Sequence, residues 1–538
     1  KNLSLNFVAS GKKTYQDLYN EVVSIANHLL HLGVKKGDKV AILSANMPNW
    51  GITQFAIANI GAIAVPVLPG FCSTELQNIL EHAEVKVIFV SRLLAKCLEG
   101  VKTPFLKHKI LINNFSTIPE GCYQPEDLDK LVPDISLNNT TPLPEVSIEE
   151  EDIASIIYTS GTTGFSKGVV LTHKNLVWDA RQCHTIQPVD ETYRFLSILP
   201  MAHTYENTLG LLLPLMYGAQ VYYLDRVPTP KLLVPAMQKI RPTVVLSVPL
   251  IIEKIYKSQV LPKFTGSKWM SKLYQFAPAR KLFNRLAGKK LMETFGGELK
   301  FFGIGGSKLD GTVEQFLREA KFPYAIGYGL TETAPMAAGS NPSQTFLQGV
   351  GPVMEGVQIK INDPDNSGQG EIWIKGPNVM KGYYKRPELT AETFTEDGWF
   401  KTGDLGSFDK KNRLAIRGRI KTMILGASGE NIYPEEIESI INNFRFVNES
   451  LVVENSGKLV AMVHFNMEEL EKQYQRLKDQ AGNYKEKIND YIEEQKQELR
   501  DYVNARVNNF SKLQLVLVQH EPFEKTPTHK IKRFLYCK

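Results

Sequence analysis

Apolar positions in the first part of the chain recur with two different spacings. After Thr14, apolar residues at three- and four-residue steps form one face of a helix that ends at Gly33. Short apolar runs typical of strands lie at 39–43, 62–65, 85–90, 194–199, 219–224, 243–248 and 299–303. Helical segments between these runs indicate β-α-β units, and therefore an α/β fold with largely parallel sheets.

A different pattern begins near residue 355. Further strand-like runs lie at 357–361, 371–375 and 413–417. They are separated by Asp, Asn and Gly, which predicts a β-rich subdomain. Beyond Arg419 a small α+β segment follows, in which Pro434 opens a helix. We therefore expect a large N-terminal domain at 1–418 and a small α+β C-terminal domain at 419–538.

Residues 467–503 carry apolar side chains at three- and four-residue steps between heavily charged faces. We interpret this stretch as a solvated helix that packs on its own small domain, with an interruption at Gly482 and Asn483. A coiled-coil site for a partner helix is the alternative.

Composition narrows the class of protein. The chain has 538 residues, of which 43% are hydrophobic and 22% charged, and this describes a globular protein of more than one domain. Lys and Arg number 63 and Asp and Glu 57, so the net charge is +6. Spread over the surface, this mild bias suits anionic small molecules or acidic lipid. It does not suit nucleic acid, which needs clustered basic patches.

Cysteine use and hydropathy indicate a cytoplasmic protein. Five scattered cysteines without CxxC spacing argue against a disulfide framework or a zinc site. The first residues have no apolar core of the kind found in signal peptides. Apolar windows at 51–71 and 208–224 are broken by Pro, Gly and polar residues, so we interpret them as helix–strand pairs rather than membrane spans. Peripheral contact with the inner face of the membrane stays open, as does a homodimer.

One loop carries the clearest chemical pattern. The sequence YTSGTTGFSKG at 158–168 ends in SKG and not in the GK[ST] of a Walker A loop. β-Branched residues follow it, so we expect a loop between two strands, with the next helix starting after Thr172 and His173. Its glycines and hydroxyl groups can still direct several donors at a phosphate group, and Lys167 adds a positive charge.

This loop closely resembles the signature of the AMP-forming, adenylate-forming superfamily, which includes acyl- and aryl-CoA synthetases, luciferases and adenylation domains of peptide synthetases. Blocks similar to those of the family follow in the expected order: LPMAHTYE (199–206), GIGGSKL (303–309), GYGLTET (327–333), GWFKTGDLG (398–406), GRIKTMI (418–424), SGENIYPEEIE (428–438) and KTPTHKIKR (525–533). The resemblance covers about residues 14 to 535.

Within the superfamily the chain looks most like the bacterial long-chain fatty acid–CoA ligases. LPMAHTYE is similar to their LP-x-x-H-x-YE block, and KTPTHKIKR to their TPT-x-K-x-KR ending, in which His529 stands where other members have Gly. The resemblance implies that ATP and Mg²⁺ convert a fatty acid into acyl-AMP and pyrophosphate, and that coenzyme A then displaces AMP. A ligase that loads an acyl carrier protein and a non-catalytic adenylate-binding sensor are the alternatives.

Carried over motif by motif, the resemblance implies a nucleotide site. The loop that grips phosphate supplies Thr159, Ser160, Gly161, Thr162, Thr163, Gly164 and Lys167. The adenine and α-phosphate side supplies Gly305, Gly306, Ser307, Tyr328, Gly329 and Thr331. Glu332, together with Thr159, would hold Mg²⁺. Asp404 would accept the ribose hydroxyl groups, and Arg419 would contact ribose or phosphate.

The resemblance also implies the residues that act on the acid. Lys530 would be the catalytic residue of the first half-reaction, with its ammonium group between the carboxylate and the α-phosphate, and Thr331 and His203 would lie beside the reacting groups. We expect His203 to position the acid, because a carboxylate needs no general base near neutral pH. The apolar residues 210–213 and 216–218 are candidates for an acyl channel, although we expect most of them to form core helix.

A hinge is implied by the same resemblance. Lys421, in the GRIK block, would be the residue about which the small domain rotates between the two half-reactions. That rotation would exchange Lys530 for a face near Gly429 and Glu430, where the thiol of coenzyme A would enter.

Overall fold

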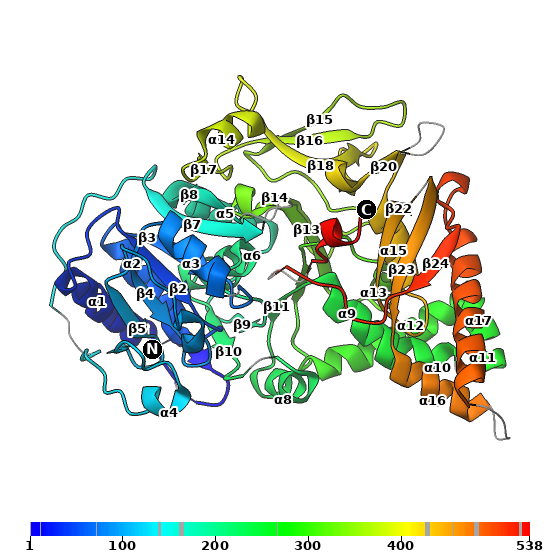
Figure 1. Cartoon of the computed structure of the whole chain (residues 1–538), viewed down its shortest axis with the longest axis horizontal. Helices are drawn as coiled ribbons and strands as arrows, with labels where there is room; N and C mark the ends of the chain where they lie inside the picture. Colours follow the sequence, from blue (N-terminus) through cyan, green and yellow to red (C-terminus); the bar gives the residue numbers. More distant parts are fainter. Residues whose placement is uncertain are drawn as a thin grey trace.

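The computed structural model describes residues 2–10, 12–71, 73–137, 141–160, 166–226, 228–265, 267–425, 431–455, 457–477, 484–526 and 530–537. Figure 1 shows two sheets flanked by helices in blue to green, a β-rich layer above them in yellow, and a smaller C-terminal part in orange and red. Within these described residues, no helix combines the length and the apolar content that crossing a membrane requires.

The first sheet has eight strands and carries the candidate phosphate loop. In spatial order its strands are β17 (Gly382–Tyr383), β8 (Ser166–Thr172), β7 (Ile153–Ser160), β3 (Ile63–Val67), β2 (Lys39–Leu43), β4 (Val85–Val90), β5 (His108–Leu111) and β6 (Ser116–Thr117). The pairings from β7 through β5 are parallel, and the pairs at both edges are antiparallel. The predicted parallel β-α-β arrangement is confirmed.

The second sheet has seven strands. In spatial order they are β1 (Leu5–Phe7), β10 (Gln220–Tyr223), β9 (Arg194–Ser197), β11 (Val244–Ser247), β12 (Phe301–Ile304), β13 (Tyr324–Gly329) and β14 (Met336–Gly339). All neighbours from β1 to β13 run parallel, and only the last pair, β13 and β14, is antiparallel. The short strand β1 was not predicted, because three residues are too few to show a periodic pattern.

Helices cover these sheets and connect their strands. They are α1 (Tyr15–His31), α2 (Pro48–Asn59), α3 (Ser73–His82), α4 (Pro125–Leu128), α5 (His173–Ile186), α6 (Thr204–Glu206), α7 (Leu213–Met216), α8 (Pro230–Ile240), α9 (Pro249–Ile255), α10 (Leu261–Thr265), α11 (Lys268–Gln275), α12 (Ala277–Thr294) and α13 (Gly311–Glu319). Local sequence explains where several of them start. Thr14 and Thr172 each form a capping box, and the Asp310 carboxylate accepts two backbone N–H groups at the start of α13.

The predicted β-rich subdomain is a four-stranded antiparallel sheet. Its strands are β15 (Gln358–Asn362), β16 (Gly370–Lys375), β18 (Phe400–Phe408) and β19 (Leu414–Arg419), and the helix α14 (Pro387–Thr393) lies beside it. β19 runs directly into the C-terminal part, so the chain leaves this sheet at Arg419.

The C-terminal part has its own core. It contains β20 (Ile424–Leu425), β21 (Asn431–Ile432), α15 (Pro434–Asn442), β22 (Val447–Asn455), β23 (Lys458–Phe465), α16 (Met467–Leu477), α17 (Tyr484–Asn504) and β24 (Leu515–Val518). Apolar residues of α16 and α17, among them Leu470, Leu499 and Val503, are buried against α15, β22 and β23. This is the packing of a helix on its own subdomain, as the periodicity predicted. Because these apolar side chains are buried in the subdomain's own core, they do not form an exposed apolar face for a coiled-coil partner.

Candidate active site

Three of the motif blocks follow the carboxyl ends of parallel strands in one sheet. His203 comes after β9, Gly305 after β12, and Tyr328 lies at the end of β13, with Glu332 just beyond. Carboxyl ends of parallel strands meet at one edge of a sheet, and α/β folds bind their ligands there. The candidate residues therefore gather at this edge although they are far apart in the sequence.

The candidate phosphate loop joins two strands, as predicted. β7 and β8 are antiparallel neighbours, and Thr159 lies opposite Lys167 and Ser160 opposite Ser166. The next helix, α5, starts at His173, which rules out the strand-to-helix geometry of a Walker A loop. Outside the described residues lie Gly161, Thr162, Thr163 and Gly164.

Tyr383 connects two candidate residues on the phosphate side. It lies in β17, which pairs with β8, and its ring centroid is 5.1 Å from the Lys167 Nζ. The Tyr383 hydroxyl donates a hydrogen bond of 2.9 Å to Glu332 Oε1. Burial lowers the pKa of Lys167, the charge of Lys421 lowers it further, and Glu332 opposes both effects. Lys167, Glu332 and the predicted hinge residue thus share one electrostatic environment.

The backbone that leads into the turn carrying Glu332 is too closely packed for a side chain at Gly329. The 3-10 turn η4 (Thr331–Thr333) follows β13 directly, and Glu332 is half-buried. A Cβ atom on Gly329 would lie 1.7 Å from the carbonyl oxygen of Pro335, so only glycine fits there. The Glu332 side chain faces Tyr383 and does not cap the turn.

Asp404 is a buried carboxylate with two partners. The register of β18 and β19 places it opposite Arg419, whose Nε lies 2.8 Å from Asp404 Oδ1. The Tyr328 hydroxyl donates to Asp404 Oδ2 over 2.9 Å. Burial raises the pKa of Asp404, and the Arg419 charge opposes this shift. Each carboxylate oxygen keeps a second lone pair, so the group can still accept hydroxyl donors from a ligand.

Lys530 reaches the same cluster from the other end of the chain. It is accessible to solvent, yet the surrounding protein lowers its pKa, and Arg419 lowers it further. Three carboxylates, Asp404, Glu332 and Glu435, oppose this shift. Its backbone N–H donates to Thr526 Oγ1 over 3.2 Å, and Lys525 and Ile531 beside it form an antiparallel bridge. The ammonium group of Lys530 therefore lies within electrostatic range of acidic candidates from the large and the small part.

His203 lies at the start of α6, where its Nδ1 accepts from the backbone N–H of Tyr205. Burial lowers its pKa to about 4, with a further contribution from the charge of Lys530. The imidazole is therefore neutral near pH 7, as suits a residue that positions a substrate. Gly305 lies against the Tyr205 ring, where a Cβ would come within 3.3 Å, whereas Gly306 and Ser307 are exposed.

A narrow apolar cavity of about 50 Å³ opens beside Tyr205. Its lining comes from α5, from the segment after His203, and from β9, β11, β12, β13 and β14. Of the candidate acyl-channel residues 210–213 and 216–218, Leu213 lines this cavity, and Met216 is instead 43% exposed. Two residues that line the cavity, Gly327 and Met336, lie close together. A Cβ on Gly327 would come within 2.8 Å of the Met336 methyl group.

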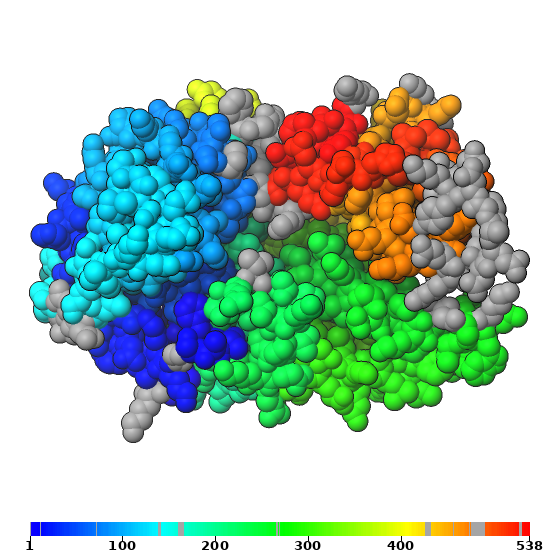
Figure 2. Space-filling model, turned by 60° about the horizontal axis from the view of Figure 1, so that its bottom comes forward, coloured from blue at the N-terminus to red at the C-terminus, as the bar shows by residue number. Residues whose placement is uncertain are grey.

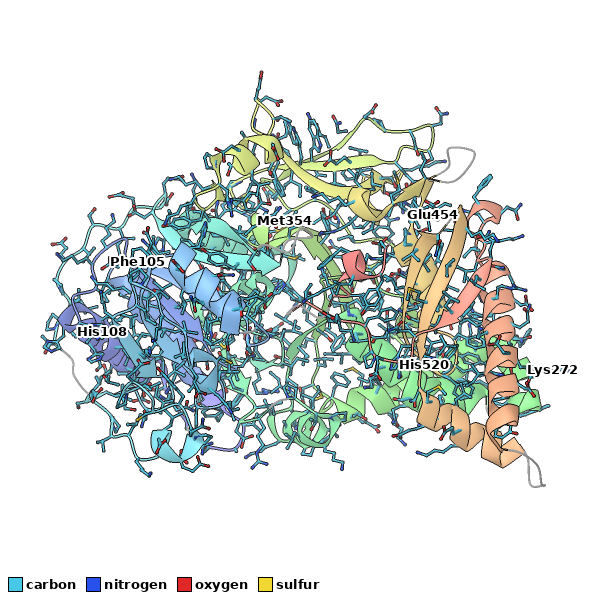
Figure 3. The ribbon with its side chains drawn as sticks, viewed as in Figure 1. Phe105, His108, Lys272, Met354, Glu454 and His520 are labelled. Carbon is cyan, nitrogen blue, oxygen red and sulfur yellow. The ribbon has the colours of Figure 1, made fainter. Side chains whose placement is uncertain are left out.

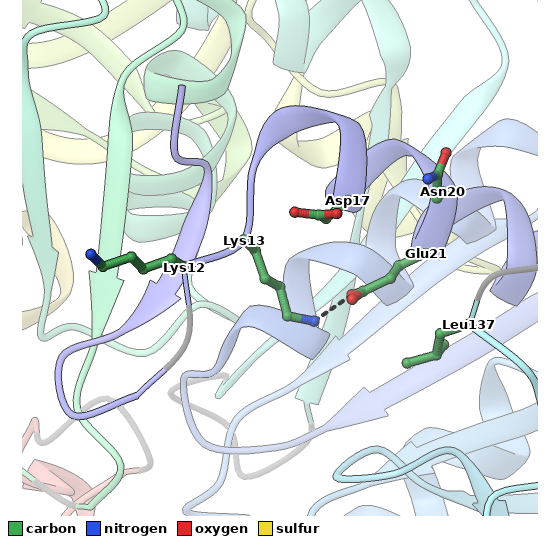
Figure 4. Close-up of a pocket in the computed structure, with 6 residues that line it drawn as sticks. All are labelled: Lys12, Lys13, Asp17, Asn20, Glu21 and Leu137. Atoms are coloured by element: carbon green, nitrogen blue, oxygen red, sulfur yellow. Dashed lines mark hydrogen bonds and ion pairs between the residues drawn. The ribbon is translucent and has the colours of Figure 1, made fainter. Parts of the chain in front are cut away.

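A second hollow lies on the surface at the start of α1, and its lining is charged or polar except for Leu137 (Figure 4). Lys13 and Glu21 form an ion pair across it, and Asp17 is occupied by the capping box with Thr14. Because its charges neutralise one another, we assign it no part in the site.

The site fits a nucleotide with Mg²⁺. Among the described residues, no group of three or more His, Cys, Asp or Glu side chains is arranged as a metal cluster. A half-buried single carboxylate such as Glu332 still suits Mg²⁺, which keeps several waters and binds one or two carboxylates together with phosphate oxygens. Thr159 and Ser160 lie at the end of β7, across from Lys167. The positive groups that could hold phosphate are Lys167, Arg419 and Lys530.

The sequence did not reveal two members of this neighbourhood. Tyr383 sits in GYYKR, where nothing but an aromatic pair after a glycine marks it, and its role follows from strand pairing. Glu435 accepts a hydrogen bond of 2.6 Å from Thr422 next to the predicted hinge, and its other oxygen is buried without a partner among the described residues. Lys421 itself lies in the 3-10 turn η5 (Ile420–Thr422). The predicted thiol-entry residues Gly429 and Glu430 lie outside the described part.

Comparisons with known proteins agree with this geometry. Residues 4–384 match the family model described as AMP-binding enzyme. The chain is 29% identical over 498 residues to the long-chain-fatty-acid–CoA ligase FadD15 of Mycobacterium bovis, covering 87% of this chain and 80% of that protein. It is 28% identical over 608 residues to the long-chain-fatty-acid–[acyl-carrier-protein] ligase AEE15, chloroplastic, of Arabidopsis thaliana, covering 97% of this chain and 81% of that protein.

A solved structure shares the fold. O-succinylbenzoate coenzyme A synthetase (MenE) from Bacillus subtilis, in complex with ATP and magnesium ion, superimposes with a TM-score of 0.74 at 22% identity, covering 99% of this chain and 96% of that one. With a family model that spans most of the chain, and with the family's motifs gathered at one sheet edge, the chain belongs to the AMP-binding enzymes of the adenylate-forming superfamily.

Proposed function

We propose that this protein is an ATP-dependent long-chain fatty acid–CoA ligase that works through an acyl-AMP intermediate. The observation that carries the proposal is the cluster of Lys530 with Asp404, Arg419 and Glu332 at the sheet edge. Activation of a carboxylate by ATP must bring several negative charges together, so it needs fixed cations and donors more than a covalent nucleophile. This cluster offers that arrangement.

In this proposal Lys530 offsets the repulsion between the acid and the α-phosphate. Two unit charges about 4 Å apart interact by about 4 kcal/mol at an effective dielectric constant of about 20, which is enough to change a barrier by several orders of magnitude. Thr331 would contact the α-phosphate. Bound to Glu332, Mg²⁺ would supply charge neutralisation for the phosphate oxygens. Lys167 and the hydroxyl groups beside it would hold the pyrophosphate that leaves.

The acid would enter beside His203. The neutral imidazole can hydrogen-bond a carboxylate without a proton transfer, and the apolar cavity that begins at Tyr205 would accept the start of the alkyl chain. At about 50 Å³ the cavity is too small for a long chain, so its walls would have to move when a fatty acid binds. Met336 is the wall residue best suited to this, because methionine is unbranched and changes rotamer easily.

We also propose that the chain divides at Arg419 and that the small C-terminal part rotates about Lys421. Support comes from its separate core and from the single covalent connection through β19 and η5. Support also comes from the electrostatic influence of Asp404 and Glu332 on Lys530 in this conformation, because the first half-reaction would need Lys530 near these groups. Coenzyme A would approach after rotation, on the face that carries Gly429 and Glu430.

A series of acids in an ATP–pyrophosphate exchange assay tests the proposal. Exchange should be weak with acetate and strongest with long-chain acids such as oleate. Absence of exchange with every acid would support the adenylate-binding sensor instead. Maximal exchange with a short acid would reject the long-chain assignment while leaving adenylation intact.

The acceptor needs a separate measurement, because the AEE15 relative is an acyl-carrier-protein ligase by name. Coenzyme A and a holo-acyl carrier protein present the same thiol arm. Consumption of purified acyl-AMP should be fast with coenzyme A and slow with the carrier protein. The reverse order would identify a carrier-protein ligase.

A further inference from the structure

One stretch of the chain carries only positive charge. Residues 254–292 contain ten Lys and Arg side chains and no Asp or Glu, whereas the net charge of the whole protein is +6. The rest of the chain is therefore net acidic. Composition alone suggested a basic excess spread over the surface, but the excess is concentrated in this stretch. This stretch forms the end of α9 together with α10, α11 and α12.

Most of these basic side chains are free. Arg280 pairs with Glu319, and Lys257 donates to the carbonyl oxygen of Val447. The following basic residues are exposed: Lys254, Lys263, Lys272, Lys281, Arg285, Lys289 and Lys290. None of these seven forms an ion pair with another residue that the structure describes. Figure 3 shows Lys272 at the outer edge of the molecule, on α11.

Large apolar side chains stand among the free charges. Trp269 is 69% exposed, Phe276 62%, Leu282 58% and Leu286 61%. Leu282 and Leu286 are one helical turn apart on α12, and the neighbouring exposed positions on that face are basic. Figure 2 shows these helices as part of the green surface along the lower side of the molecule. On α12, apolar groups and cations thus share one exposed face.

The helices α10, α11 and α12 are closely packed on their inner side. On the inner side, Phe264 stacks on Tyr274 with ring centroids 4.9 Å apart and on Phe283 at 5.6 Å. Gly288 of α12 lies so close to Ala320 that a Cβ would come within 2.6 Å of its methyl group. The helices are therefore packed against the body of the protein, while the side chains of Trp269, Phe276, Leu282 and Leu286 stay more than half exposed.

We propose that the α11–α12 face docks this protein on a lipid bilayer that contains anionic lipid. Lys and Arg side chains near a membrane surface are attracted by acidic headgroups, while Trp, Phe and Leu enter the boundary between headgroups and acyl chains. A bilayer with anionic headgroups uses both features at once. A nucleic acid backbone would use the cations and would leave Leu282 and Leu286 in water.

The inference does not rest on the proposed function, since it follows from the face alone. If the protein is also a long-chain fatty acid ligase, docking would bring its site to the phase in which long-chain acids dissolve. The docking proposal and the proposed function can fail separately, because vesicle binding is measured without ATP or fatty acid.

Sedimentation with vesicles tests the proposal on the whole chain. The protein should bind vesicles of phosphatidylcholine mixed with phosphatidylglycerol, and it should bind pure phosphatidylcholine far less. The variant Lys281→Gln/Arg285→Gln/Lys289→Gln should lose about a hundredfold in partition coefficient, at about 1 kcal/mol per basic residue. The variant Leu282→Ser/Leu286→Ser should lose about tenfold or more, because it removes the inserted apolar surface.

Matched controls separate this face from general effects. Lys410→Gln/Lys411→Gln/Lys458→Gln removes three exposed cations elsewhere, and Leu93→Ser/Val132→Ser removes two exposed apolar side chains elsewhere. Both should bind like the wild type, and all four variants should keep the wild-type unfolding temperature.

Three results would overturn the proposal. The first is a wild type that does not sediment with anionic vesicles, and the second is an equal loss in the control and test variants. The third is a loss in the basic variant with none in the leucine variant, accompanied by tight binding of heparin, which would indicate a polyanion site.

Discussion

At the scale of single residues, Lys530 should separate the two half-reactions. Lys530→Ala should lower acyl-AMP formation by at least a hundredfold, because the charge beside the α-phosphate is lost, while thioester formation from supplied acyl-AMP stays within a fewfold of wild type. ATP–pyrophosphate exchange and acyl-AMP consumption measure the two steps. Lys532→Ala, two positions further along, is the control and should leave both unchanged. Equal loss in both steps would contradict the assignment.

Tyr383 gives a second residue-scale prediction. Tyr383→Phe keeps the ring beneath Lys167 and removes only the hydroxyl that donates to Glu332. A hydrogen bond to a charged group contributes about 1.5 kcal/mol, so the KM for Mg-ATP should rise about tenfold with little change in stability. Steady-state kinetics at varied Mg-ATP measure this. Tyr384→Phe is the matched control, and an equal effect there would reject the role given to Tyr383.

Glu206 should make stability depend on pH. It is 2% exposed, and burial raises its pKa from 4.5 to about 8. The folded protein therefore keeps a proton that the unfolded chain releases above pH 4.5, so stability from the neutral carboxyl is lost as pH rises toward 8. Glu206→Gln removes this dependence. Its stability relative to wild type should grow by about 4 kcal/mol between pH 4.5 and pH 8.

Urea unfolding at the two pH values measures that difference. The exposed Glu388→Gln is the control and should show no comparable growth. A constant difference between wild type and Glu206→Gln across this range would mean that Glu206 is ionised in the folded protein.

At the scale of elements, α17 holds the small C-terminal part together. Leu499 is fully buried in the core formed with α15 and β23, so Leu499→Ala should reduce the free energy of unfolding of this part by about 2–5 kcal/mol. Hydrogen exchange of α15 and α17 amides would report it. Leu515→Ala, at a side chain 44% exposed, should have little effect. If Leu499→Ala instead changed only the oligomeric state, α17 would be a partner helix.

At the scale of the whole molecule, three polar contacts among the described residues join the two parts in addition to the Asp404–Arg419 pair. Lys308 lies 2.7 Å from Glu436, Ser439 donates to Asp310, and Lys257 donates to a backbone carbonyl of the small part. Lys308 follows the glycine pair of the adenine-side block, and Glu436 follows Glu435 in α15. These contacts favour the arrangement that keeps Lys530 in the cluster.

Reversing one charge of this pair should therefore slow the first half-reaction. Lys308→Glu should reduce acyl-AMP formation about fivefold, a loss of about 1 kcal/mol, and spare thioester formation, because exposed ion pairs are weak but like charges repel. Adding Glu436→Lys should restore the rate. The pair Lys174 and Glu151, which lies within the large part, is the control, and its single and double swaps should change neither step.

Local sequence patterns predicted much of the fold and many of the site candidates. Helix starts at Thr14 and Thr172, the strands and the antiparallel loop follow from periodicity and capping, which act between near neighbours. The basic excess at 254–292 was equally visible in the sequence. The sequence did not show whether these basic residues form an exposed face, because only the burial of each side chain distinguishes a face that packs on the protein from one that is exposed to solvent.

The sequence by itself determined the candidate residues for phosphate, carboxylate and amine chemistry, because candidates are identified from residue type and motif. Only the tertiary structure decided which of them meet. Lys530 and Glu332 are brought into one electrostatic cluster, and Tyr383 is placed between Lys167 and Glu332. The physical reason is that parallel strands bring their carboxyl ends to one edge whatever their separation along the chain, and no local pattern records that meeting.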